Sequence, residues 1–299
     1  MENVIEKAKQ SGEIVSPWKL VWRRFRKNGF VLAGTILLIV LLLLVIVGPL
    51  FSPYGRDEFN LENKLKAPSA SHWLGTDEIG RDYFTRLLYG GQISLSVGLV
   101  AVAITIVIGV LVGGISGYFG GIVDSILMRF AEIVYSFPFI PLIITLSSAL
   151  MGVIDPQYKI FLVMALIGLL SWPGPARVVR GQILSLREQE FMEAATALGI
   201  SDWRKITRHL IPNTIGYIII YAMLEMAGAI LTESALSFLG MGVQPPTPSW
   251  GNMIQYARQS RFLENYPWLW IPPGISIFLS VMSVNLLGEG LRNAFDPKS

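Results

Sequence analysis

Residues 29–51 read GFVLAGTILLIVLLLLVIVGPLF and contain no charged side chain. An α-helix crosses roughly 30 Å of hydrocarbon with about 20 apolar residues, so this stretch predicts a transmembrane helix. The whole chain of 299 residues has the same character, with 52% hydrophobic residues, 15% charged residues and a mean hydropathy of +0.53. Soluble domains carry about 25% charged residues, and the chain is therefore expected to be an integral membrane protein.

Further apolar runs give six expected transmembrane helices, at residues 29–51, 93–115, 130–154, 160–174, 211–239 and 268–287. In the third run Pro138 and Pro141 each remove an amide donor, which predicts a kink. The fourth run is short, because its apolar core ends at Trp172-Pro173-Gly174-Pro175. It reaches the length of a span only if the helix continues past these prolines.

The distribution of basic residues sets the expected orientation. With six spans and the N-terminus inside, most of the 24 basic residues lie in cytoplasmic segments, as orientation by loop charge requires. Omitting the fourth span would place the basic stretch 177–208 outside, so six spans and two cytoplasmic termini are expected. The same bias explains the net charge of +3 and the pI of about 9.1 without any binding of nucleic acid.

The spans divide the chain into segments with different expected roles. In the N-terminal tail, Trp18 and Trp22 flank a basic cluster, which predicts a helix at the membrane interface. The long segment after the first span is expected to fold against the extracytoplasmic mouth. The expected boundaries are a cytoplasmic tail at 1–28, a first span at 29–51, an extracytoplasmic segment at 52–91, a core of five helices at 92–290 with a cytoplasmic loop at 175–210, and a cytoplasmic C-terminus at 291–299.

Glycines recur at every fourth position of the second span, at Gly109, Gly113, Gly117 and Gly121. In a continuous helix they lie near one face, and a face of small residues lets another helix approach closely. Gly109 and Gly113 are the better packing candidates, because Gly120-Gly121 is expected to break the helix at the following turn.

The principal candidate site lies in the loop between the fourth and fifth spans. Phe191, Ala194, Ala195 and Leu198 fall at i, i+3, i+4 and i+7, which predicts a short amphipathic helix with Gly199 as its C-terminal cap. The small alanines would let this helix settle into a partner's groove, with the two larger residues as anchors. A helix packed on its own membrane domain gives the same stripe, so both interpretations remain open.

The sequence predicts no catalytic or metal-binding site in this chain. It contains no cysteine and no Gly-x-x-x-x-Gly-Lys-Ser/Thr loop for the phosphates of ATP. Its two histidines, His72 and His209, lie on opposite sides of the membrane in the expected topology and cannot share an ion. Any ATP hydrolysis that this chain depends on would therefore take place in another protein.

Among the polar residues within the expected spans, Glu225, Glu233 and Asn285 are singled out. Ionisable and polar groups in hydrocarbon are costly, so these three are candidates for the translocation path or its gate. For Glu225 three roles remain open: an interhelical hydrogen bond or ion pair, a cavity-lining contact to cargo, and a gating contact. Arg129 and Glu132 are three residues apart and are expected to pair on one helix face.

Several motifs resemble one family of bacterial transporters. Glu193-Ala194-Ala195, three residues, Gly199 and a further run to Pro212 resembles the EAA loop of ABC importer permeases. The match departs at His209, where the broad pattern has isoleucine, and at Ile211, where it has leucine. Other stretches are similar to C-type permeases of dipeptide and oligopeptide transporters: HWLGTDEIGRD at 72–82, RLLYG at 86–90, ISL at 93–95, LSFLG at 236–240 and QPPTPSWG at 244–251.

The resemblance implies an all-α integral membrane protein with six transmembrane helices and the fold of an ABC type I importer permease. It implies a subunit of the bacterial or archaeal cytoplasmic membrane that translocates dipeptides or oligopeptides delivered by an extracytoplasmic solute-binding protein. It also implies a heterodimer with a B-type permease and two separate ATPase subunits that bind ATP and Mg. The residues implied to couple to the ATPase are Phe191, Glu193, Ala194, Ala195, Leu198 and Gly199.

Two alternatives remain for the cargo and the energy source. Nickel and glutathione importers share this permease type, so the motifs identify the family better than the cargo. An ion-coupled secondary carrier would instead use Glu225 and Glu233 for protons or sodium. Such carriers often contain internal repeats with interrupted helices in matching positions, and the sequence shows no convincing repeat.

Overall fold

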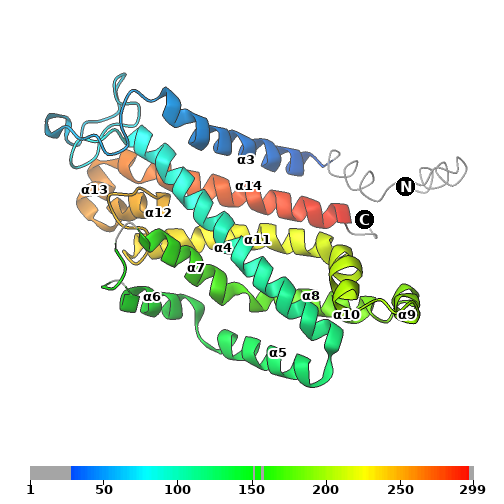
Figure 1. The fold of residues 1–299 in the computed structure, drawn as a ribbon. Helices are drawn as coiled ribbons and strands as arrows, with labels where there is room; N and C mark the ends of the chain where they lie inside the picture. The colour runs from blue at the N-terminus through cyan, green and yellow to red at the C-terminus, as the bar shows by residue number, and fades with distance from the viewer. Residues whose placement is uncertain (1–27, 151, 156–157, 296–299) are drawn as a thin grey trace, which may run out of the picture.

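The computed structural model describes residues 28–150, 152–155 and 158–295, and within these ranges the chain is built from helices and connecting loops (Figure 1). Extended pairing within the described part is limited to one isolated bridge, between Thr76 and Asp82. The expected interfacial helix with Trp18 and Trp22 lies outside the described residues.

Five segments are long and apolar enough to cross a membrane, and a bent pair of helices provides a sixth if it is counted as one span. One of the five candidates is α4 alone, and the other four are runs of consecutive elements. The bent pair is α5 with α6. The elements are α3 (Gly29–Val47), η1 (Gly48–Phe51), α4 (Tyr83–Phe119), α5 (Gly121–Ser136), α6 (Phe139–Leu150), α7 (Lys159–Ser171), α8 (Pro173–Leu186), α11 (Ile211–Phe238) and α14 (Ile271–Phe295).

The second span is longer than its apolar run. It begins at Tyr83, inside the segment expected to be a loop, because the Asp82 carboxylate accepts a hydrogen bond from the Thr85 amide at 2.8 Å and caps the helix. It ends at Phe119, because Gly120 and the following glycine have φ values of +64° and +52° that favour glycine. The expected break at this glycine pair is confirmed.

Proline has opposite effects in the third and fourth spans. Between α5 and α6 the chain breaks at Phe137-Pro138, and the two helix axes differ by 81°, so the expected kink is a complete break. At the fourth span, Pro173 occupies the first position of α8, where its missing amide donor costs little. Helix α8 therefore continues from α7, and the joined segment Lys159–Leu186 is long enough to cross the membrane.

Helices α4 and α8 approach each other along the glycine face. A Cβ atom added to Gly113 would lie 2.3 Å from the carbonyl oxygen of Ala176, and one added to Gly109 would lie 2.6 Å from the ring of Pro175. At Gly117 the added atom would lie 2.9 Å from another α8 carbonyl oxygen. The two backbones are therefore in direct contact, as predicted for Gly109 and Gly113, and the contact extends to Gly117.

Residues 52–82 pack onto α4 and onto the segment before α14. The Trp268 indole donates to the carbonyl of Thr76 at 3.5 Å, and Leu65 and Leu74 pack against a buried cluster that contains Tyr83 of α4 and Leu269. That second segment holds the short elements α12 (Trp250–Met253), η5 (Ile254–Arg258), α13 (Ser260–Asn265) and η6 (Pro267–Leu269), and residues 52–82 hold η2 (Leu61–Asn63).

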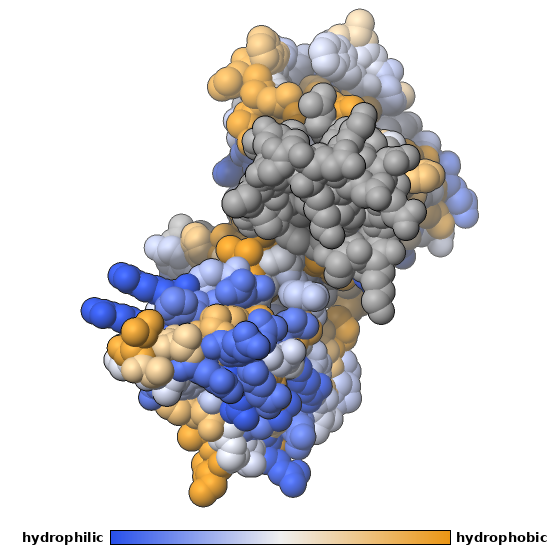
Figure 2. All heavy atoms as spheres, turned by 90° about the vertical axis from the view of Figure 1, so that its right-hand side faces the viewer, coloured by the Kyte–Doolittle hydropathy of each residue, from blue (hydrophilic) through white to orange (hydrophobic). Residues whose placement is uncertain are grey.

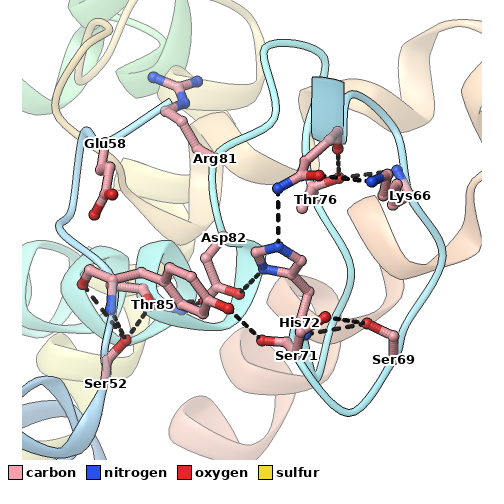
Figure 3. A network of polar contacts seen from close by, with 12 residues as sticks. Ser52, Glu58, Lys66, Ser69, Ser71, His72, Thr76, Arg81, Asp82 and Thr85 are labelled. Carbon is pink, nitrogen blue, oxygen red and sulfur yellow. Dashed lines mark hydrogen bonds and ion pairs between the residues drawn. The ribbon is translucent and has the colours of Figure 1, made fainter. Parts of the chain in front are cut away.

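A polar network centred on Asp82 fixes residues 52–82 (Figure 3). The Asp82 carboxylate lies 2.9 Å from Nδ1 of His72, and both side chains are buried. The Ser52 and Thr85 hydroxyls are 2.5 Å apart, and Thr85 in turn donates to Asp82 at 2.7 Å. The residue that caps α4 thereby also holds the loop in place.

The opposite end of the molecule carries α9 (Glu190–Ala197), α10 (Asp202–Arg204) and η4 (Lys205–Leu210), which leads into α11 (Figure 1). Helix α3 begins and α14 ends at this same end. Element η4 is a π-helical turn, and the Ile211 amide that follows it donates to Ile206, one residue further back than in an α-helix.

The contact between α4 and α8 can be tested with single methyl groups. Gly113→Ala is expected to lower stability by about 1–3 kcal/mol, because the added carbon cannot fit against a backbone oxygen. Gly181→Ala on α8 is the matched control, since nothing lies within 4 Å of its added Cβ. The measurement is the midpoint of thermal unfolding of the purified protein in detergent, and equal midpoints for the two variants would contradict the close approach.

Candidate functional site

One face of α9 packs on the chain's own helices. Met192 and Ala195 are each only 4% exposed. Met192 belongs to a buried cluster that joins α8, η4 and α9, and whose other members are Val179, Ile183, Ile206 and Leu210. This face therefore anchors α9 to the ends of two spans.

The other face of α9 is open to solvent. Leu198 is 79% exposed and Phe191 is 37% exposed, and Ala194 between them is also exposed. Figure 2 views this end of the molecule and shows hydrophobic residues beside a largely hydrophilic surface. The predicted stripe is therefore divided: Ala195 faces the chain's own core, which corrects its expected outward position, while the remaining three residues form an exposed apolar face.

Glycine ends α9 as the sequence predicts. Gly199 has a φ of +68°, and its amide donates to Thr196 at 3.0 Å while the Ile200 amide donates to Ala195 at 3.1 Å. This paired arrangement is a Schellman motif, which satisfies the last carbonyl groups of a helix. The chain can thus turn immediately after Leu198 and return toward α11.

Charged side chains tie this end of the chain together. Arg187 donates to the carbonyls of Gly117 and Tyr118 at 3.2 and 3.1 Å. The negative C-terminal end of the α4 dipole stabilises a cation at this position. Arg180 of α8 pairs with Asp124 of α5 at 2.5 Å. Sequence reasoning did not assign these contacts, because they join residues far apart in the chain and follow no local pattern.

A second link joins α4 to the turn after α9. The Tyr118 hydroxyl donates to Asp202 at 2.5 Å, and Lys205 donates to the same carboxylate at 3.3 Å. Glu193 is exposed and lies with Thr196 beside a hollow between α9 and the end of α4. The position of α9 is therefore set from both of its ends.

Glu233 is completely buried in helix packing. Its carboxylate accepts hydrogen bonds from Ser94 of α4 at 3.0 Å and from Ser237 at 2.7 Å. Ser94 also accepts from the amide of Trp250, which connects the same group to α12. Glu233 thus joins three helices in the single chain, and its assignment to the translocation path stays a prediction.

The other polar candidates lie in different surroundings. Glu225 is half-buried on α11, where it interacts with Ser171 at the end of α7. Asn285 is exposed in a hollow of α14 that also includes Leu224 of α11. Their assignment to the translocation path stays a prediction.

The predicted pair of Arg129 and Glu132 is present. The two side chains approach to 3.3 Å on the exposed face of α5. Exposed pairs of this kind contribute little to stability, so a local structural role is sufficient for them.

Comparisons with known proteins agree with this architecture. Residues 105–299 match the family described as the binding-protein-dependent transport system inner membrane component. Residues 16–68 match the N-terminal transmembrane domain of oligopeptide transport permease C.

Relatives match over nearly the full chain. The dipeptide transport system permease protein DppC of Alkalihalophilus pseudofirmus is 40% identical over 284 residues, covering 95% of this chain and 91% of the relative. The oligopeptide transport system permease protein OppC of Haemophilus influenzae is 41% identical, covering 95% and 89%. OppC of Bacillus subtilis is 38% identical, covering 99% and 94%.

The apolar helices and these matches define a multi-pass membrane permease with the all-α fold of an ABC type I importer, as expected from the sequence. The chain belongs to the family of binding-protein-dependent transport system inner membrane components. Its role is that of a transport subunit.

Substitution of Glu233 separates a packing role from a transport role. Glu233→Ala is expected to lower stability by about 1–3 kcal/mol, because the Ser94 and Ser237 hydroxyls lose their acceptor. Glu233→Gln keeps an acceptor at this position, and we expect near-normal stability and near-normal uptake of cargo. The measurements are thermal unfolding and uptake in the reconstituted transporter. A stable Gln variant that does not transport would instead place Glu233 in the translocation path.

Proposed function

We propose that this chain is the C-type permease subunit of an ATP-driven importer of dipeptides or oligopeptides in the cytoplasmic membrane. The cargo is supported by the relatives named as dipeptide and oligopeptide permease proteins, which this chain matches over most of its length. In this assignment the end that carries α9 faces the cytoplasm. The start of α3 and the end of α14 then lie on the cytoplasmic side, in agreement with the charge distribution.

The observation that carries the proposal is the two-faced construction of α9. Met192 and Ala195 fix the helix to the permease, while Phe191, Ala194 and Leu198 remain exposed. A short helix with a small central residue and larger apolar neighbours suits insertion into a groove of a partner. We propose that the partner is an ATPase subunit and that α9 is its docking helix.

The proposed assembly contains a B-type permease as heterodimer partner, two ATPase subunits and an extracytoplasmic solute-binding protein. ATP and Mg would bind in the ATPase subunits, since this sequence lacks a phosphate-binding loop. The permease itself would supply the path and a mechanical connection to the site of hydrolysis.

The contacts of α9 suggest how force would reach the spans. A displacement of α9 acts on Met192 and Ala195, and through their buried surroundings on α8 and η4. Arg187 and Asp202 connect the same region to the end of α4. Because packed helices move as rigid elements, closure of the ATPases would tilt α4, α8 and α11 relative to the rest of the chain.

Substitution on the exposed face of α9 tests the docking. Leu198→Glu and Ala194→Arg are expected to reduce co-purification of the ATPase at least tenfold while leaving folding unchanged, because both side chains point away from the permease core. Leu263→Glu on α13, at an exposed position near the opposite end, is the matched control. Ala195 is unsuitable for this test, since a larger side chain there would disturb the permease itself. Normal recovery of ATPase with both α9 variants would reject the docking assignment.

The cargo is tested by uptake into proteoliposomes that hold the complete transporter. We expect ATP-dependent uptake of a dipeptide or an oligopeptide, abolished by Leu198→Glu, with nickel and glutathione as parallel cargoes. Uptake of nickel or glutathione without peptide uptake would reject peptide as the cargo. Uptake driven by an ion gradient in the absence of ATP would reject the importer mechanism.

A further inference from the structure

A group of polar side chains, here called the mid-depth cluster, lies beside the junction of α7 and α8. Its members come from three helices: Tyr135 of α5, Arg177 of α8, and Tyr221 and Glu225 of α11. The guanidinium carbon of Arg177 lies 4.6 Å from the centre of the Tyr135 ring. Glu225 follows Tyr221 by four residues on α11, so these two side chains are neighbours on one helix face.

A glycine makes room for this cluster. A Cβ atom added to Gly174 would lie 1.9 Å from the Tyr221 hydroxyl oxygen and 3.0 Å from the Tyr135 hydroxyl oxygen. The two hydroxyls therefore meet over the same point of the α8 backbone. Glycine at this position is what allows residues from α5 and α11 to reach one another across α8.

The cluster lies inside candidate spans, including Arg177, which the sequence alone places at the start of the cytoplasmic loop 175–210. At about 1.5 Å per residue, Arg177 is about 14 Å from the end of α8, and Tyr221 and Glu225 are about 15 and 21 Å from the start of α11. These lengths are shorter than a hydrocarbon layer of about 30 Å. Tyr135 lies at the end of α5, where the bent span is broken.

The charges of the cluster do not neutralise each other. The ion pairs among the described residues include neither Arg177 nor Glu225. Arg177 is exposed on the single chain, as is Tyr135 at 50%, while Glu225 is half-buried. A cation at this depth is too costly to leave in lipid, so the face that it occupies must meet either an aqueous path or another polar group.

We propose that the mid-depth cluster is a binding site for zwitterionic peptides within the translocation path, in which Arg177 binds the carboxylate of the cargo and Glu225 binds its ammonium group. The inference rests on the proposed function and deepens it by naming residues that would hold the cargo. Broken helices at mid-depth, as at the end of α5, are typical of substrate sites in membrane transporters.

The arrangement suits such a ligand for two reasons. The contact with the Tyr135 ring restrains the Arg177 side chain, and a guanidinium group can bind both oxygens of a carboxylate. Arg177 and Glu225 have no ion-pair partner among the described residues, so each is available to one charged end of a zwitterion. Peptides of different sequence share these two termini, which is the feature that a peptide path can recognise in every cargo.

The test measures equilibrium binding of a radiolabelled tripeptide to the complete permease–ATPase complex in nanodiscs, without the solute-binding protein. The wild type is expected to bind the free peptide saturably and to bind the C-terminally amidated peptide about tenfold more weakly, because a charge-assisted contact is lost. Arg177→Gln is expected to bind the free peptide about tenfold more weakly and to discriminate no longer between the two peptides. Glu225→Gln is expected to lose discrimination against the N-acetylated peptide in the same way.

Arg129→Gln is the matched control, because Arg129 is exposed on α5 and already paired with Glu132; it is expected to bind like the wild type. Arg177→Lys keeps the positive charge but lacks a guanidinium group that can bind both carboxylate oxygens, so an intermediate affinity for the free peptide is expected. The proposal is overturned if the wild type shows no saturable binding of the free peptide. It is also overturned if Arg177→Gln weakens the binding of the free and the amidated peptide by the same factor. It is also overturned if Arg177→Gln prevents assembly while Arg177→Lys binds peptide normally, because Arg177 would then contact another subunit. Peptide uptake by the wild type is measured separately, so the proposed function can stand even when this site fails.

Discussion

Direct backbone contact between α4 and α8 is the interaction on which the remaining architecture depends. It requires glycine at Gly109, Gly113 and Gly117, and it brings the end of α4 close enough for Arg187 to bind its last carbonyl groups. Helix α8 in turn leads to α9, whose buried face packs on it. In lipid, where apolar surface gives no driving force between helices, such close packing and interhelical hydrogen bonds must supply the association energy.

Much of this architecture could be predicted from the sequence, because it depends on local composition. The apolar runs indicated the spans, the four-residue glycine period indicated the α4 contact face, and Gly199 indicated the end of α9. Proline was harder to interpret. Pro138 ends a helix and Pro173 begins one that continues its predecessor, and the difference lies in what surrounds each residue rather than in the residue itself.

The candidate site was predictable in outline but not in its details. Periodicity placed Ala194 and Ala195 on one apolar stripe, but it cannot tell which edge of the stripe is covered by the rest of the chain, and only Ala195 is buried. Glu233 shows the same limit, because a carboxylate in a span is recognisable while the serines that bind it are not. Ser94 lies on another helix, and its contact exists only in the folded chain.

The π-helical turn at η4 lies within the connection between Gly199 and Pro212. A π turn holds one residue more than the α-helical turn that it replaces, so deleting one residue there would let α11 run on as a regular helix. The turn takes up its extra residue locally, so this deletion would leave α9 facing nearly the same way. In a regular α-helical turn, the same deletion would rotate everything before it by about 100° around the helix axis. Element η4 is therefore the part of this connection where one residue can be removed without turning the exposed face of α9 away from its partner.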